Sequence, residues 1–171
     1  IALESALLKA ASNNNVWELL DSNVDEMPIP VGCCIGGGKH AVDSCDFQEF
    51  LVIPHGENFN DNLLINKKIY SQIKNNLGTR KKSFTGGWTT KLDNLSILDF
   101  LKKISEEILE NFNIHVGLGI DVAGSHLFNG GDYFYRKGKL TRENQIRYVN
   151  GLINRYSLEY VEDPLNEDDS E

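Results

Sequence analysis

Residues 114–123 read Ile-His-Val-Gly-Leu-Gly-Ile-Asp-Val-Ala, and residues 158–165 read Leu-Glu-Tyr-Val-Glu-Asp-Pro-Leu. The first apolar run closes with Asp121, and the second closes with Glu162 and Asp163. Short apolar runs of this kind are typical of buried strands. Because carboxylates at the C-terminal ends of neighbouring parallel strands converge on one face, we expect these acids to lie close together.

Amphipathic segments and further apolar runs precede and separate these two stretches. Isoleucines at four-residue spacing followed by Gly78 mark one helix, and Thr141 is placed to cap another. The predicted elements are, in chain order, a helix over residues 2–12, strands over 31–35 and 47–53, helices over 60–77 and 94–111, a strand over 114–122, a turn over 129–131, a helix after Thr141, and a strand over 158–161.

This order predicts an α/β fold with largely parallel strands, and it leaves open an antiparallel pairing of the first two strands. Four strands and three intervening helices make about half of an eight-stranded barrel of the TIM type. A complete barrel takes roughly 250 residues, and this chain has 171. We therefore expect a partial barrel, with strand edges that need a partner.

Composition narrows the possible partners. The net charge of −8 argues against nucleic acid, which attracts basic patches. No apolar run approaches the ~20 residues needed to cross a bilayer, so no membrane partner is expected. The cysteines are odd in number and lack zinc spacing, which predicts small buried apolar residues in a reducing, cytoplasmic protein. They are Cys33, Cys34 and Cys45.

The glycine-rich stretch Gly36-Gly37-Gly38-Lys39-His40 follows the first predicted strand. Glycines would let backbone N–H groups approach an anion, although the spacer and Lys-Ser/Thr pair of a P-loop are missing. A single histidine in such a loop is more often structural than catalytic. The other histidines fit no predicted site: His55, His115 and His126.

Three carboxylates are candidates for chemistry. Glu49 lies inside an apolar strand, where a charge is costly unless it meets a partner or a site, so it is a candidate for proton transfer. Asp121 and Glu162 could bind Mg²⁺, which prefers a few carboxylate oxygens together with water and substrate oxygens. The pattern alone leaves open that these two acids only cap helices or solvate loops.

Four stretches, taken together and in order, resemble the enolase family, in a style closest to archaeal enolases. They are the glycine-rich loop of residues 36–41, the Gln-Glu-Phe strand of 47–54, the run of 116–123, and the Glu-Asp-Pro-Leu segment of 162–165 with the acids of 167–169. The resemblance covers essentially the whole chain. It implies that residues 1–27 end a capping region and its linker helix, and that residues 28–171 form the first half of a barrel.

The resemblance also implies a function. Enolases are Mg²⁺-dependent lyases of glycolysis and gluconeogenesis that dehydrate 2-phosphoglycerate to phosphoenolpyruvate. By resemblance, Asp121 and Glu162 ligate Mg²⁺. Gln48 and Glu49 line the substrate pocket, and His40 also approaches the substrate, so Glu49 and His40 are the candidates for catalysis. A homo-oligomer is expected for the full-length protein.

Departures from the family pattern bear on activity. Where the family's Asp-Glu-Gly-Gly loop carries a glutamate acid, this chain has Thr85, whose hydroxyl cannot act as a general acid near neutral pH. The family's third metal ligand, lysine base and phosphate-binding arginine are expected beyond Glu171, and most of its capping domain before Ile1. The 171-residue chain alone is therefore expected to have no turnover. Two alternatives stay open: an enolase-like binding or scaffold protein without dehydratase activity, and another Mg²⁺-dependent enzyme of the superfamily.

Overall fold

The structure is a computed structural model that describes residues 2–12, 15–20, 27–41 and 43–169. Its elements are, in chain order, α1 (Ala2–Ala11), α2 (Val16–Leu20), β1 (Gly32–Gly36), the 3₁₀ helix η1 (Gly38–His40), β2 (Glu49–His55), α3 (Phe59–Leu77), α4 (Asn94–Phe112), β3 (His115–Asp121), α5 (Gly124–Leu127), β4 (Phe128–Asn129), β5 (Asp132–Tyr135), β6 (Gly138–Thr141), α6 (Arg142–Tyr156) and β7 (Tyr160–Glu162). Every element predicted from the sequence is present, within a few residues of its predicted bounds.

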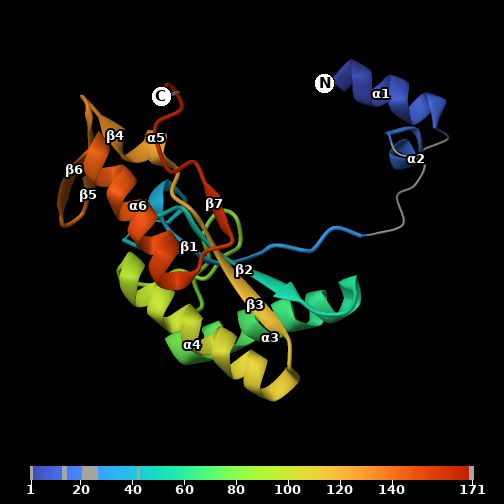
Figure 1. The fold of residues 1–171 in the computed structure, drawn as a ribbon, viewed down its shortest axis with the longest axis horizontal. Helices are drawn as coiled ribbons and strands as arrows, with labels where there is room; N and C mark the ends of the chain where they lie inside the picture. The colour runs from blue at the N-terminus through green and yellow to red at the C-terminus, as the bar shows by residue number, and fades with distance from the viewer. Residues whose placement is uncertain (1, 13–14, 21–26, 42, 170–171) are drawn as a thin grey trace.

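The main sheet has four strands in the order β1-β2-β3-β7 (Figure 1). Three of the four strands, β1, β3 and β7, run in the same direction, as predicted. The strand β2 runs against them, so the β1–β2 and β2–β3 pairs are antiparallel and the β3–β7 pair is parallel. Two successive helices, α3 and α4, return the chain to the end of β2 that it left, so β3 starts beside that end. The long connection from β3 to β7, which contains α5, the strands β4 to β6 and the helix α6, gives the crossover that a parallel pair requires. The described strands form an open sheet and not a closed barrel.

One face of this sheet packs against helices. Alternate side chains of the two central strands, including Phe50, Val52 and Leu118, are buried in one apolar cluster with isoleucines and leucines of α3 and α4. The isoleucines predicted to face inward from α3 are those that are buried. Because side chains alternate along a strand, the residues between these core positions point to the opposite face of the sheet.

The long helices begin and end at the residues that the sequence marks. Asn58, Asp93 and Thr141 each accept a hydrogen bond from a backbone N–H in the first turn of α3, α4 and α6. Gly78 ends α3 in the left-handed conformation, with φ 59°. The predicted helix cap at Thr141 and helix stop at Gly78 are both confirmed.

A second, three-stranded sheet of β4, β5 and β6 was not predicted. Its strands have two to four residues each, which is too short for an alternation pattern to be seen. The predicted turn at residues 129–131 joins β4 to β5. Tyr133 anchors this sheet: its side chain is fully buried, and its hydroxyl accepts a hydrogen bond from the Asn166 N–H at 2.9 Å.

The first two helices lie apart from the sheet in Figure 1, and neither contains a buried residue. The predicted boundary between a capping region and the barrel follows residues 21–26, which lie outside the described residues. Among the described residues, no helix combines the length and apolar character needed to span a membrane.

Candidate active site

The three candidate carboxylates lie side by side at one end of the main sheet. Glu49 of β2 is the cross-strand partner of Asp121 of β3, and Asp121 is in turn the partner of Glu162 of β7. Directly paired residues of neighbouring strands point to the same face of a sheet. The strands therefore form an acid row, Glu49–Asp121–Glu162, on the face opposite the helices, where the parallel strands β3 and β7 end.

Asp121 is the buried member of the acid row, a residue that is only 5% exposed. Its Oδ2 accepts a hydrogen bond from Gln48 Nε2 at 2.8 Å, and its Oδ1 accepts one from the Ala123 N–H at 2.8 Å. Burial raises the pKa of this carboxyl, and the charges of Glu162 and Glu49 raise it further against the lowering effect of the two hydrogen bonds. A positive charge beside Asp121 would therefore stabilise its ionised form.

The backbone after each strand end is held in an unusual conformation. Ala123 and Asp163 both have positive φ, at 49° and 43°, which is uncommon for residues other than glycine. Backbone hydrogen bonds join the two ends, from the Val122 N–H to the Glu162 carbonyl at 3.1 Å and from the Gly124 N–H to the Asp163 carbonyl at 2.7 Å. These bonds fix the positions of Asp121 and Glu162 relative to each other.

Gln48 and His40 each have a buried polar atom without a partner. Gln48 donates to Asp121, but its own Oε1 is buried and accepts no hydrogen bond. His40 Nδ1 is likewise buried and unpaired, and the ring lies 6.0 Å from that of Phe84. Most buried polar atoms in folded proteins are hydrogen-bonded, so unpaired ones mark places where a ligand or ordered water would bind.

The glycine-rich loop does not offer its backbone to an anion as predicted. The N–H groups of Gly36, Gly37 and Gly38 donate to backbone carbonyls of Trp88, Gln48 and Cys45 at 2.9–3.0 Å. A Cβ on Gly37 would lie 2.2 Å from Cys45 Sγ. The three glycines therefore serve close packing of the loop, which brings Gly38 at the start of η1 alongside Gln48.

Thr85 lies beside the acid row in a tight loop. Its Oγ1 is 3.2 Å from Ser83 Oγ and 3.9 Å from Cys33 Sγ. Burial, together with the nearby Glu49 charge, raises the pKa of the Cys33 thiol to about 12, and Cys33 interacts with both Thr85 and Glu49. The loop thus faces the acid row but presents a hydroxyl there instead of a carboxyl.

Comparison with known proteins decides the family. Residues 24–171 match the family model for the enolase C-terminal TIM barrel domain. The chain belongs to the enolase family. It is 35% identical to the enolase of Methanocorpusculum labreanum over 100% of this chain and 46% of that protein. It is 38% identical to the enolase of Archaeoglobus fulgidus, over 85% of this chain and 38% of that protein. The predicted resemblance to archaeal enolases is confirmed, and the chain spans less than half the length of these relatives.

The enolase-family acid row is suited to a divalent cation. No ion pair of the described residues reaches Glu49, Asp121 or Glu162, so no described basic side chain balances their charge. Carboxylate oxygens are the ligands that Mg²⁺ prefers. The three carboxylates are not among the described groups whose donor atoms all lie within 4.8 Å of one another, so one ion contacts at most part of the row directly in this geometry.

Two of the three cysteines are buried packing residues, as predicted, and Cys33 is only partly buried. All three are free, and Cys34 and Cys45 are fully buried. Burial raises the pKa of Cys45 to about 11 and raises that of Cys34 further. Sequence reasoning missed a different group: His55, His115 and Glu159 converge at the opposite end of the same strands. Both histidines are terminal residues of paired strands, which is the signal that could have revealed them.

Proposed function

We propose that the whole protein is a phosphopyruvate hydratase that dehydrates 2-phosphoglycerate to phosphoenolpyruvate with Mg²⁺. The observation that carries the proposal is the acid row: three carboxylates paired across neighbouring strands at the active-site end of an enolase-family sheet. The proposal includes the cytoplasmic location and the homo-oligomeric state expected of the full-length protein, and the division into a capping region over 1–27 and a barrel from residue 28.

In this proposal Asp121 and Glu162 hold Mg²⁺. When bound, Mg²⁺ supplies the positive charge that stabilises negative charge developing on the substrate carboxylate. Gln48 and Ala123 fix the Asp121 carboxylate in place through hydrogen bonds at 2.8 Å. Tyr160 donates to Glu162 Oε2 at 3.1 Å and steadies the more exposed ligand.

The substrate contacts are assigned to His40, Gln48 and Glu49. The unpaired Nδ1 of His40 and Oε1 of Gln48 are available to substrate hydroxyl or phosphate groups. Glu49 is half-buried and borders the Asp121 carboxylate, a position from which it can exchange a proton with a bound hydroxyl group. A cavity of about 270 Å³ borders Gln48 and has Lys39 and Ala123 in its lining.

One observation favours a second function, an enolase-like binding or scaffold protein with impaired dehydration. The loop that faces Glu49 carries Thr85, and its hydroxyl is in contact with Ser83 and Cys33 rather than with a carboxyl group. Loss of a positioned general acid lowers a rate by roughly 10²–10⁴-fold. A protein of this second kind would keep the cation site and lose most of its turnover.

An assay of the purified whole protein separates the two functions. Phosphoenolpyruvate formation from 2-phosphoglycerate is followed by its ultraviolet absorbance, after chelation of metal and again after addition of MgCl₂. The hydratase proposal predicts turnover that depends on Mg²⁺ and that falls by roughly 10²–10⁴-fold in Glu49→Gln. Binding of 2-phosphoglycerate without turnover would favour the scaffold function, and absence of both would overturn the proposal.

A further inference from the structure

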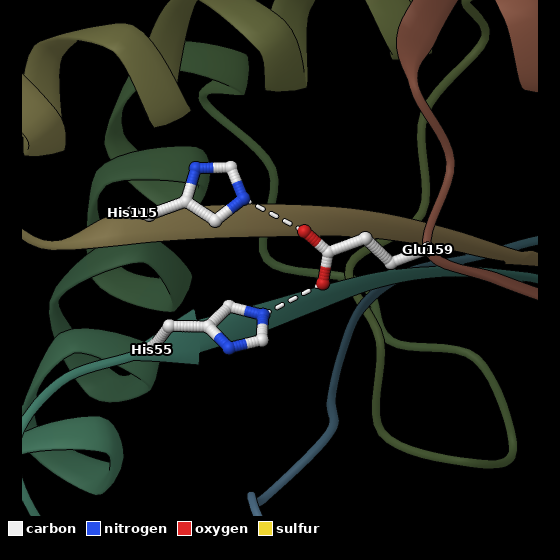
Figure 2. A group of neighbouring side chains, drawn as sticks. All are labelled: His55, His115 and Glu159. Atoms are coloured by element: carbon white, nitrogen blue, oxygen red, sulfur yellow. Dashed lines mark hydrogen bonds and ion pairs between the residues drawn. The ribbon is translucent and has the colours of Figure 1, made fainter.

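The side chains of His55, His115 and Glu159 converge at the end of the main sheet that lies opposite the acid row. His55 ends β2, His115 begins β3, and the two are cross-strand partners. Glu159 directly precedes β7, and its N–H donates to the Leu118 carbonyl at 2.9 Å. Figure 2 shows the Glu159 carboxylate reaching from the segment just before β7 toward both imidazole rings.

The geometry within this histidine–glutamate group is close and symmetric. His55 Nε2 lies 2.6 Å from Glu159 Oε2, and His115 Nε2 lies 2.7 Å from Glu159 Oε1. The ring centroids are 5.4 Å apart. Among the residues that the structure describes, this is the one group of three histidine, cysteine or acidic residues whose donor atoms all lie within 4.8 Å of one another.

The strand beneath the carboxylate leaves room for it. A Cβ on Gly117 would lie 2.2 Å from both Cδ and Oε2 of Glu159, so only glycine at this position allows the carboxylate to lie over the strand. The side chains of His55, His115 and Glu159 are 35%, 61% and 32% exposed, which leaves the group accessible from solvent. The carboxylate therefore occupies the space above Gly117 that a Cβ would fill, and an ion can reach all three side chains from solvent.

We propose that His55, His115 and Glu159 form a binding site for a divalent transition-metal ion of the Zn²⁺ class. Two neutral imidazoles and one carboxylate are a donor set of catalytic zinc sites, in which water takes the fourth position. Metal–ligand distances of roughly 2.0–2.2 Å put tetrahedral donor atoms about 3.3 Å apart, so each nitrogen–oxygen distance would lengthen by roughly 0.6 Å. Side chains that are this exposed can make that shift.

The donor set distinguishes this site from the acid row. Imidazole nitrogens suit Zn²⁺, Cu²⁺ and Ni²⁺, whereas Mg²⁺ prefers oxygen ligands and near-octahedral geometry. The two sites are about 20 Å apart along β2, at roughly 3.3 Å per residue. A bound ion would join β2, β3 and the start of β7, and it would stabilise the sheet without taking part in dehydration. The proposal therefore does not depend on the proposed function.

Isothermal titration of the chelator-treated whole protein with ZnCl₂, in the presence of excess MgCl₂, tests the site. We expect one Zn²⁺ per chain, with affinity lowered at least ~10²-fold in His115→Ala, since loss of an outer-shell partner alone lowers metal affinity 10–100-fold. His126→Ala, which removes a histidine elsewhere, and Asp121→Asn, which removes an acid-row ligand, should both keep the Zn²⁺ affinity.

Two further measurements guard against misfolding and adventitious binding. His115→Gln should keep the circular dichroism spectrum of the wild type and still lose Zn²⁺. Co²⁺, used as a spectroscopic probe, should give the visible absorption bands of a tetrahedral nitrogen–oxygen site in the wild type and not in His55→Ala. Equal Zn²⁺ affinity in the wild type and in folded His115 variants, or no Zn²⁺ binding at all, would overturn the proposal.

Discussion

The strands β2, β3 and β7 carry a polar group at each end, and the two groups differ in how their charges are balanced. At one end the acid row gathers like charges beside the buried Asp121, and no described basic side chain balances them. At the other end Glu159 lies between two imidazoles that hydrogen-bond to both its oxygens. Burial opposes ionisation of Glu159, yet the hydrogen bonds from His115 and His55 outweigh it and lower the pKa of that carboxyl. We therefore propose that the first end requires a cation from solution, whereas at the second end hydrogen bonds from both histidines hold the carboxylate in place before any ion binds.

The largest expected effect is on turnover at the acid row. Asp121→Asn removes a cation ligand and should lower kcat/KM of the whole protein at least ~10²–10³-fold, comparable to loss of one preorganised electrostatic group. The fold should tolerate this change, because a flipped Gln48 amide can present its unpaired Oε1 to the new side chain. Steady-state kinetics against Lys103→Ala, an exposed position on α4, provides the comparison.

A kinetic effect of opposite sign is expected at the loop that faces the acid row. Thr85→Glu places a carboxyl group where the resemblance predicts the family's acid and should raise turnover, by up to the ~10²–10⁴-fold that a positioned acid contributes. Thr85→Gln, of nearly the same size but without acid function, should bring no gain. If glutamate gives no gain over glutamine, another group fills the acid's role.

At the opposite end, Gly117→Ala should disturb the histidine–glutamate group alone. The added Cβ would displace the Glu159 carboxylate from both histidines. We expect a loss of about 1–2 kcal/mol in the free energy of unfolding, since these partly exposed bonds are modest, together with weaker Zn²⁺ binding. Urea unfolding measures the change in the free energy of unfolding, and titration with ZnCl₂ measures the change in Zn²⁺ affinity. A fall in Mg²⁺ affinity of similar size would show that the two ends are not independent.

The smallest expected effect is a loss of stability at Asp93, which belongs neither to the acid row nor to the histidine–glutamate group. Asp93 caps α4, and the hydrogen bonds from Lys137 and from the Ser96 N–H hold the pKa of its carboxyl well below the ordinary value. Asp93→Ala should lose about 1 kcal/mol of stability, the usual value of an N-cap. Asp93→Asn keeps the cap and should lose less.

The pH dependence of this last effect has a definite sign. Because the pKa of Asp93 is lower in the folded state than its ordinary value of 3.8, its contribution is present above about pH 4 and is lost as the pH falls through the folded value. Urea unfolding at pH 7 and at pH 3 should therefore show a smaller difference between wild type and Asp93→Ala at the lower pH. An unchanged difference would mean that the charge of Asp93 does not contribute.

The sequence predicts the acid row better than it predicts the strand pairing or the histidine–glutamate group, and the reason is physical. Apolar runs closed by Asp121 and Glu162 place both acids at strand ends, and the alternation around Glu49 sets its side chain on the same face. Both helices between β2 and β3 are predicted from the sequence, but the direction in which the strands pair depends on how those helices pack on the sheet, which periodicity does not encode. The histidine–glutamate group depends on the register of β2 against β3 and on the space above Gly117, and both exist only in the folded sheet.

The most direct test of the central claim is isothermal titration of the chelator-treated whole protein with MgCl₂. Wild type is compared with Asp121→Asn and with Glu159→Gln, a carboxylate-to-amide change at the opposite end of the same strands. The acid-row account predicts that Asp121→Asn loses Mg²⁺ binding while Glu159→Gln keeps the wild-type affinity. Equal Mg²⁺ affinity in the wild type and Asp121→Asn would contradict it.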